Sequence, residues 1–431
     1  MLLMTETLQT LKGFRDFLPA EKRKRDFVAQ KMRTVFERHG FAPLETPTLE
    51  YASLLLGKYG DEADKLVYTF EDRGERQVGL RYDQTVPTAR VLAQYQNDLP
   101  RYFRRYQIGN VFRADKPQKG RYREFTQCDC DVFGSLCPLA DAEILSVYYD
   151  VFKEVGLGSI LIELNDRQTL VQALSPFSND SVSVFSIIQS VDKLDKMSSG
   201  EVTSELVAKG IKKDFADQVI TAIATAQPST NLKAIIEAAV QLGVPRQNLV
   251  FNPRIARGLD YYTGMIFEGR IPEYTVGSVG GGGRYDNLIK NLSGFEMPAV
   301  GFGIGFDRTV EAADQLGLLS EEAGTRVLIA IMSEQDIPAS LEAAQKMRAA
   351  GIATEVYPAI DKLAKQFKLA DQKKIQYVIV IGEDERKAEK VTLKNLRTGD
   401  QGLLSLEQCQ YIIQPEENVG CCGGGCDGCG H

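Results

Sequence analysis

Before residue 310, strand-like segments in this sequence lie in a hairpin pattern at 64–82 and in two blocks, residues 101–134 and 251–308, and the two blocks are separated by a long stretch of a different character. The intervening residues 166–250 follow helical patterns, are rich in Ser, Lys and Asp, and lack strand-like runs. Within each block the strands follow one another through polar or glycine-containing turns, which is typical of hairpins. With helices at both ends, this pattern predicts an α+β domain built around an antiparallel sheet, with residues 166–250 as a helical insertion.

Helices are predicted on either side of the first block. Residues 19–41 carry apolar side chains at helical spacing, namely Phe27, Val28, Met32, Val35 and Phe36. Gly40 ends this pattern, and a second amphipathic pattern at residues 139–157 also closes with a glycine. Both helices present an apolar stripe that we expect to pack against the sheet.

The last third of the chain shows a different alternation. After a linker at residues 317–324, the sequence alternates strand-like runs at 325–332, 352–358 and 376–384 with helical patterns at 337–349 and 361–373. Strands that alternate with helices are typical of small parallel sheets. We therefore expect a second domain, of the α/β class, over residues 325–412.

Histidine is nearly absent from the chain, which restricts its chemistry. The two histidines are His39, in a basic helical segment, and His431, so mechanisms that need a histidine general base or a nucleophilic triad are disfavoured. A net charge of −7 argues against indiscriminate binding of nucleic acid, while a local basic surface remains compatible with it. Apolar runs of membrane-spanning length and a secretory signal pattern are absent, so we expect a cytoplasmic protein.

Two strands of the first block form a hairpin with polar side chains along one face. Alternation along residues 124–134 places Phe125, Gln127, Asp129, Asp131 and Phe133 on one face, and Cys128, Cys130 and Val132 on the core side. The joining segment carries Arg113, Lys116, Lys119, Arg121 and Arg123. Guanidinium groups bind phosphate oxygens, so the hairpin is suited to hold a small cationic molecule beside a polyphosphate. A solvent-exposed polar face is the alternative.

The second block contains two glycine-rich segments and a run that combines an arginine with two tyrosines. The segments "VGSVGGGGRYD" (276–286) and "GFGIGFDR" (301–308) let the backbone approach a ligand closely. Neither contains the Gly-Lys-Ser/Thr of a phosphate-binding loop. The run "RIARGLDYYTG" (254–264) indicates either one wall of a substrate pocket or a structural ion pair, Arg257 with Asp260, among core tyrosines.

Taken together, these segments resemble the three signature motifs of class II aminoacyl-tRNA synthetases. "FRADKPQKGRYREFTQCDCDVFG" (112–134) is similar to motif 2, "PAVGFGIGFDR" (298–308) to motif 3, and the first helix with "ETPTLEY" (45–51) to motif 1. More narrowly, "LRYDQTVPTAR" (80–90) and "ARGLDYYTG" (256–264) resemble the two signature segments of the histidyl-tRNA synthetase family. The resemblance covers about residues 10–410, in the family's order and spacing.

The resemblance implies a class II catalytic domain at residues 1–165 and 251–316, a helical insertion domain at 166–250 and an anticodon-binding domain at 325–412. The tail at 413–431 lies outside it. This tail offers ligand types for zinc or copper, namely Cys421, Cys422, Cys426, Cys429 and His431. Because it is mostly glycine, without apolar residues to pack beneath a metal, a disordered tail is the alternative.

Members of this family join L-histidine to ATP as an adenylate, release PPi, and pass histidine to the 3′ end of tRNA(His). The resemblance places a group of side chains around histidine: Asp83, Gln84, Thr85, Arg113, Gln127, Asp131, Arg257, Tyr261 and Tyr262. Among them, Asp83, Thr85 and Gln127 match positions that hold the α-ammonium, while Asp131 and Tyr262 match those that hold the imidazole. Gln84 stands where many relatives have Leu or Glu, and we expect little effect from that difference.

The resemblance assigns a second group to ATP: Arg113, Asp115, Arg121, Phe125 and Arg308. Arg113 matches the contact to the α-phosphate, Arg121 a contact to the γ-phosphate, and Phe125 the ring that stacks on adenine. Arg113 and Arg257 are the implied catalytic residues, and Mg²⁺ is the implied ion. Two positions depart from the family's pattern, since Asp115 and Asp307 stand where Glu is commoner.

The implied partners are tRNA(His), L-histidine, ATP and a second copy of the chain, because motif 1 forms a two-fold interface in this class; neither a membrane nor DNA is implied. Three alternatives remain open. A synthetase-like regulatory subunit of a phosphoribosyltransferase would have lost the arginines, yet Arg113, Arg121, Arg257 and Arg308 are present. The others are an uncharged-tRNA sensor module, and an active paralogue with another substrate.

Overall fold

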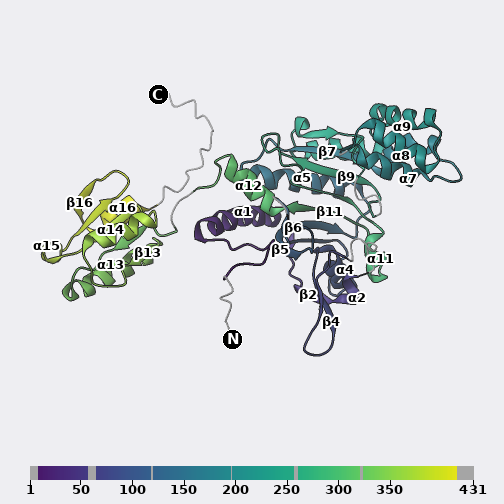
Figure 1. The fold of residues 1–431 in the computed structure, drawn as a ribbon. Helices are drawn as coiled ribbons and strands as arrows, with labels where there is room; N and C mark the ends of the chain where they lie inside the picture. Colours follow the sequence, from purple (N-terminus) through teal and green to yellow (C-terminus); the bar gives the residue numbers. More distant parts are fainter. Residues whose placement is uncertain are drawn as a thin grey trace, which may run out of the picture. The chain divides into compact units, whose positions relative to one another are not determined.

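The computed structural model describes residues 8–56, 65–117, 120–195, 197–256, 261–320 and 324–414. The chain divides after Leu319 into two compact units, which are considered separately (Figure 1). In the described part of the chain, no helix combines the length and apolar character that crossing a membrane requires.

The first unit is organised around an eight-stranded sheet with the order β1-β5-β6-β11-β10-β9-β7-β8. Its strands are β1 (Ala42–Pro43), β5 (Phe103–Phe112), β6 (Glu124–Phe133), β7 (Leu161–Asp166), β8 (Leu249–Phe251), β9 (Met265–Arg270), β10 (Gly280–Arg284) and β11 (Ala299–Gly305). Neighbours from β5 to β7 pair antiparallel, whereas β1 and β8 pair in parallel at the two edges. The predicted antiparallel sheet is confirmed, and both strand blocks contribute to it.

Helices α1 (Pro19–Arg38), α5 (Pro138–Val155), α10 (Thr230–Gln241) and α12 (Phe306–Gln315) cover one face of this sheet and share its largest apolar core (Figure 1). Helix α1 buries Val28, Met32 and Val35 on one stripe, although Phe27 remains 47% exposed. Helix α5 ends at Gly156, whose φ of 96° is the left-handed conformation that glycine adopts without a steric penalty.

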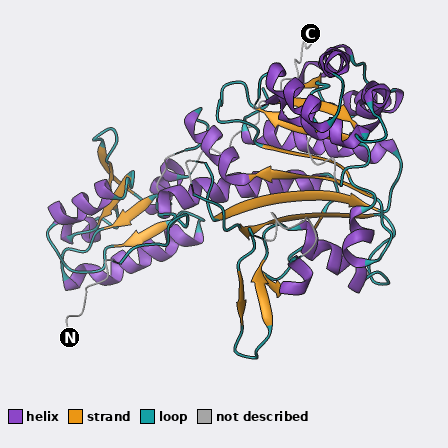
Figure 2. Ribbon diagram, turned by 45° about the vertical axis from the view of Figure 1, so that its right-hand side comes forward, coloured by secondary structure: helices purple, strands orange, loops and turns teal. Residues whose placement is uncertain are grey.

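The opposite face carries α4 (Thr85–Gln94), α11 (Leu288–Ser293) and α2 (Ala52–Leu55), with a three-stranded sheet of β2 (Leu49–Tyr51), β3 (Thr69–Glu71) and β4 (Gln77–Leu80). Their apolar side chains form a second core with Phe103, Phe133 and Ala299 of the large sheet. In Figure 2 the small strands extend away from the long central strands. Because this core covers only part of the face, polar side chains can line the remainder.

The segment between β7 and β8 was expected to be a helical insertion over residues 166–250. Helices α6 (Arg167–Leu174), α7 (Val184–Val191), α8 (Ser199–Lys209) and α9 (Lys213–Thr225) form an apolar core of their own. In contrast, α10 packs against α5 and β8 completes the large sheet. The part with a separate core is therefore shorter than the expected segment, because α10 buries its apolar stripe against the main core.

The second unit has a five-stranded sheet with the order β13-β12-β14-β15-β16. Strand β12 (Val327–Ile329) pairs in parallel with β13 (Thr354–Val356) and β14 (Tyr377–Val380), as the alternating pattern predicted. Strands β15 (Val391–Asn395) and β16 (Gln401–Leu404) add an antiparallel hairpin. The helices of this unit are α13 (Ile337–Ala349), α14 (Leu363–Gln372), α15 (Glu383–Lys387) and α16 (Leu406–Ile413).

Candidate active site

Strand β6 presents a polar face and an apolar face, as its alternation predicts. Cys128 and Cys130 are fully buried in the core beneath α1 and α5. Gln127, Asp129 and Asp131 therefore point to the other side of the sheet. Asp129 and Asp131 are 4% and 5% exposed, so two carboxylates are enclosed on the face that also carries α4 and α11.

The glycines of β11 make room for these carboxylates. Gly301 pairs with Asp131 and Gly303 with Asp129 across the β6–β11 ladder. A Cβ atom at Gly301 would lie 1.9 Å from Asp131 Oδ1, and one at Gly303 would lie 3.0 Å from Asp129 Oδ1. Both carboxylates thus lean over the bare backbone of β11 toward β10, which explains why a ligand-facing strand requires glycine here.

A pocket of about 400 Å³ opens over the same glycine-rich strands. Predicted site residues from separate parts of the chain line it: Arg113, Asp115, Arg121, Phe125, Tyr261, Tyr262 and Arg308. Its floor includes Gly280, Gly281 and Gly282 of β10, and Glu268 of β9 stands in its wall. The volume lies in the range of small-molecule sites, and the wall joins basic side chains to aromatic ones.

Single backbone contacts fix two of the pocket arginines. Arg113 Nε donates to the carbonyl oxygen of Tyr82 at 3.0 Å, and the Arg113 guanidinium lies 5.1 Å from the ring centre of Phe125. Arg308 Nη1 donates to the Ser278 carbonyl oxygen at 2.7 Å. Because a guanidinium carries five N–H donors, one such bond orients the group without exhausting its capacity to bind an anion. Arg121 is more exposed, and its Nε lies 3.8 Å from Asp115 Oδ2.

Asp131 is held from two sides by residues that the sequence reasoning missed. Arg105 Nη2 lies 2.7 Å from Asp131 Oδ2, and the Tyr285 hydroxyl donates to Asp131 Oδ1. Burial raises the pKa of Asp131, while the charge of Arg105 and the bond from Tyr285 oppose that rise. Burial also raises the pKa of Asp129, to about 7.

The signal for Arg105 was present in the sequence. Residues directly opposite on neighbouring strands share a face, and Arg105 pairs with Asp131 as Gln107 pairs with Asp129. Counting back in steps of two from Arg113 therefore reaches Arg105. Glu268 and Tyr285 could not be found in this way, because Glu268 comes from β9 and Tyr285 follows the end of β10.

The start of α4 brings three predicted histidine-binding residues to the same face. Asp83 Oδ1 accepts a bond from the Val86 amide at 3.0 Å, and burial raises the pKa of Asp83. Thr85 is the first residue of the helix. Gln84 is fully buried, and its Nε2 donates to the carbonyl oxygens of Gly109 and Gln127 at 3.1 Å each. The Gln84 side chain therefore joins α4 to β5 and β6.

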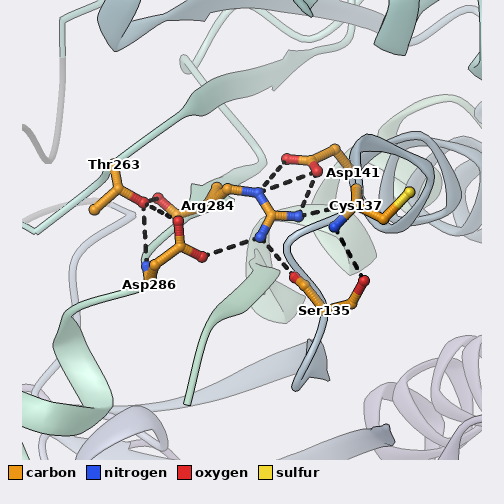
Figure 3. Close-up of polar contacts among 6 residues, drawn as sticks. All are labelled: Ser135, Cys137, Asp141, Thr263, Arg284 and Asp286. Atoms are coloured by element: carbon orange, nitrogen blue, oxygen red, sulfur yellow. Dashed lines mark hydrogen bonds and ion pairs between the residues drawn. The ribbon is translucent and has the colours of Figure 1, made fainter. Parts of the chain in front are cut away.

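The tyrosine segment is anchored through Arg284, the last residue of β10. Figure 3 shows its guanidinium between Asp141 and Asp286, with Nε 3.0 Å from Asp141 Oδ1 and Nη1 3.0 Å from Asp286 Oδ1. Thr263 donates to Asp286 Oδ2 at 2.8 Å, and its amide donates to the Arg284 carbonyl oxygen at 2.7 Å. The ring centres of the preceding Tyr261 and Tyr262 lie 4.3 Å apart.

Asp307, which replaces the commoner Glu next to Arg308, has structural partners. It forms ion pairs with Arg15, at 3.1 Å, and with Arg25, and its Oδ2 accepts the Thr126 amide at 3.1 Å. The carboxylate thus ties α12 to α1 and β6. The Asp307 side chain is shorter than that of Glu, and these contacts occupy both of its carboxylate oxygens.

Several predicted site residues lie outside the described part of the chain. They are Arg257 and the tail residues Cys421, Cys422, Cys426, Cys429 and His431. Within the described ranges, His, Cys, Asp and Glu side chains form no cluster suited to a metal ion. Cys128, Cys130 and Cys409 are buried free thiols there.

An antiparallel sheet that presents an arginine-bearing hairpin, together with a glycine-rich strand that leads directly into a helix carrying Arg308, defines the catalytic domain of a class II aminoacyl-tRNA synthetase. Residues 13–309 match the family model of histidyl-tRNA synthetase, and residues 326–414 match the model of an anticodon-binding domain. The chain therefore belongs to the histidyl-tRNA synthetase family.

Individual relatives agree with this assignment. The histidine–tRNA ligase of Wolinella succinogenes is 39% identical over 94% of this chain and 98% of its own. That of Phocaeicola vulgatus is 35% identical over 94% of this chain and 98% of its own. The crystal structure of histidyl-tRNA synthetase from Nostoc sp. PCC 7120 superposes with a TM-score of 0.83 at 31% identity, covering 94% of this chain and 99% of that one.

Proposed function

We propose that this protein is a histidine–tRNA ligase, which forms histidyl-adenylate from L-histidine and ATP and then charges tRNA(His). The carboxylate of histidine attacks the α-phosphate of ATP in line and PPi leaves. The 3′ end of the tRNA then takes histidine from the adenylate. One observation carries the proposal: in a chain of this family, a single pocket joins Arg113, Arg121 and Arg308 to Phe125 and the tyrosine pair.

The nucleotide occupies the basic and aromatic part of this pocket. Arg113 binds the α-phosphate, and its guanidinium already lies beside Phe125, on which the adenine stacks. Arg121 and Arg308 hold the remaining phosphates, while Asp115 faces the adenine. The backbone contacts of Arg113 and Arg308 support these roles, because pre-oriented donors stabilise developing charge without reorganisation.

Histidine occupies the acidic part, near Asp83, Thr85 and Gln127, which bind its α-ammonium. Asp131 and Tyr262 satisfy the two ring nitrogens. A site that binds both nitrogens rejects analogues that leave its polar groups unpaired, by factors of roughly 10⁴–10⁵. Arg257 stabilises the charge that grows on the phosphoryl oxygens during attack, and thereby lowers the barrier to adenylate formation.

Mg²⁺ belongs to the same proposal. Glu268 stands in the pocket wall with the arginines, and carboxylate oxygens together with substrate phosphates are the ligands that Mg²⁺ prefers. The ion would offset phosphate charge. Asp307 is not part of this set, because Arg15 and Arg25 hold it.

The remaining parts of the proposal concern assembly and location. Residues 325–412 form the domain that recognises the anticodon of tRNA(His), which the family match at 326–414 supports. We further propose a cytoplasmic homodimer. Residues 1–165 with 251–316 act as the catalytic domain, residues 166–250 as the insertion and 413–431 as the tail.

The test is histidine-dependent exchange of labelled PPi into ATP by the purified protein, followed by charging of transcribed tRNA(His). We expect exchange with histidine and with no other standard amino acid, and charging that depends on the tRNA. An Asp131→Ala variant should lose discrimination between histidine and its ring analogues. Absence of exchange, with the protein folded, would refute the proposal.

A further inference from the structure

Arg105 occupies an unusual position beneath the proposed histidine site. Its side chain is only 1% exposed and projects from the middle of β5 on the face that carries the two buried aspartates. Lysine and arginine are almost never buried to this extent unless they are paired. Arg105 is not among the residues that the proposed reaction uses directly, so its burial needs an explanation.

The contacts of Asp131 show what Arg105 restrains. Arg105 Nη2 lies 2.7 Å from Oδ2, the Tyr285 hydroxyl donates to Oδ1, and the carboxylate rests over the bare backbone of Gly301. Oδ2 thus has an ion-pair partner from β5, and Oδ1 accepts a hydrogen bond from the residue that follows β10. The carboxylate is fixed in position before any substrate arrives.

The charges around Asp131 determine its protonation state. The groups that face it or its neighbours are Arg105 from β5, Asp129 on its own strand and Tyr285 after β10, with Asp83 and Arg113 farther along the face. Burial raises the pKa of both β6 carboxyls, and two neighbouring carboxylates disfavour simultaneous ionisation. Arg105 contacts Asp131 and so favours its ionised form, whereas burial and the neighbouring carboxylate of Asp131 favour the protonated form of Asp129.

A purely structural role accounts poorly for this pair. Among the residues that the structure describes, neither Nε nor Nη1 of Arg105 has a hydrogen-bond partner, although both atoms are buried. A buried ion pair with incomplete hydrogen bonding adds little stability compared with apolar side chains of the same volume. The arrangement is better explained by a requirement for charge at Asp131.

We propose that Arg105 is a positioning residue for substrate selection, which holds Asp131 as an ionised acceptor for a ring N–H of histidine. This inference rests on the proposed function. The carboxylate leans toward β10, where Tyr262 packs against Gly283, and so faces the proposed partner of the other ring nitrogen. Without Arg105, burial favours the protonated form of Asp131, which lacks the capacity of a charged acceptor.

The test compares Arg105→Met and Arg105→Lys with Arg104→Met in PPi exchange. Arg104 is a matched control, because it neighbours Arg105 on β5 but pairs with Glu143 on the opposite face. We expect Arg105→Met to raise KM for histidine about 10- to 100-fold near pH 7, the scale of losing a charged hydrogen bond. That KM should fall as pH rises, because Asp131 ionises again. KM for ATP should stay near wild type, Arg105→Lys should restore part of the affinity, and Arg104→Met should change neither constant.

The outcomes separate this inference from the proposed function. A wild-type protein that is folded but inactive in PPi exchange would refute both the proposed function and the inference about Arg105. If the wild-type protein is active but Arg105→Met leaves the histidine KM and its pH profile unchanged, the inference about Arg105 is refuted and the proposed function stands. An Asp129→Asn variant that retains Arg105 supplies a second measurement, in case Arg105→Met does not fold, because it removes the neighbouring carboxyl whose pKa is about 7. Its histidine KM should be flat between about pH 7 and 8.5, and a tenfold change there would show that Asp131 titrates despite Arg105.

Discussion

Substitution of Gly301 by alanine tests the geometry of the acidic part of the site. Gly301 lies on β11 directly opposite Asp131. An added Cβ would lie 1.9 Å from Asp131 Oδ1 and 2.7 Å from the carbonyl oxygen of Cys130. That carbonyl belongs to the adjacent strand and cannot move far without disrupting the ladder. The Asp131 carboxylate must therefore leave its position, and with it the contacts to Arg105 and Tyr285.

Two terms set the magnitude. Overpacking a tight site costs about 1–3 kcal/mol, and loss of a hydrogen bond to a charged group costs about 1.5–3 kcal/mol. We expect Gly301→Ala to lower the free energy of unfolding by about 2.5–6 kcal/mol and to raise KM for histidine at least about tenfold. Gly303→Ala should cost less, because its Cβ would meet only side-chain ends, Asp129 Oδ1 and Gln127 Nε2, each at 3.0 Å.

Urea unfolding and PPi exchange measure both quantities, with Gly200→Ala as the control. No atom lies within 4 Å of a Cβ at Gly200, and this residue is in α8, where alanine stabilises a helix by up to about 1 kcal/mol. The expected order of destabilisation is Gly301, then Gly303, then Gly200. A Gly301→Ala protein with wild-type stability and wild-type KM for histidine would show that Asp131 does not occupy the space above β11.

Three further predictions concern charged residues. The folded-state pKa of Asp129, about 7, lies above its unfolded value, so the native state gains stability from this proton at low pH and loses it as pH rises through 7. Asp129→Asn has no carboxyl to ionise and does not lose this stability. The unfolding free energy of the variant minus that of wild type should therefore rise between about pH 4 and pH 7. A difference that stays constant over this range would contradict a raised pKa for Asp129. Asp141→Ala leaves the buried Arg284 with Asp286 as its remaining carboxylate partner, and should cost about 1.5–3 kcal/mol in urea unfolding; a loss below about 1 kcal/mol would contradict a tight buried pair. Arg257→Ala should slow adenylate formation roughly 10²–10³-fold at near-normal stability; unchanged PPi exchange would exclude its catalytic role.

The β5–β6 hairpin could be predicted because its pattern is local. Alternation along residues 124–134 separates Cys128 and Cys130 from Asp129 and Asp131, and the structure places the two cysteines in the core. The parallel strands of the second unit were equally evident, since apolar runs and helices alternate there. In both cases each segment carries its own signal.

The edges of the large sheet could not be predicted in the same way. Strands β1 and β8 have two and three residues, too few for an alternation pattern. Both exist because a neighbouring strand supplies parallel partners. Helix α10 likewise shows the same periodicity as α8 and α9, but its apolar stripe packs against α5. Which core a helix joins depends on tertiary contacts that its own sequence does not specify.

The arginines of β5 show the same limit within the site. Arg104 and Arg105 are adjacent in the sequence, whereas strand alternation places them on opposite faces of β5. Arg104 pairs with Glu143 on one face, and Arg105 meets Asp131 on the other. Alternation alone gives the face, but the identity of the partner follows from the register between β5 and β6. Arginine side chains are usually exposed, so the burial of Arg105 is informative. Exceptions to such rules are expected mainly at functional sites. Arg105, which no sequence motif singled out, is thus the residue whose removal most directly tests how the pocket recognises an imidazole.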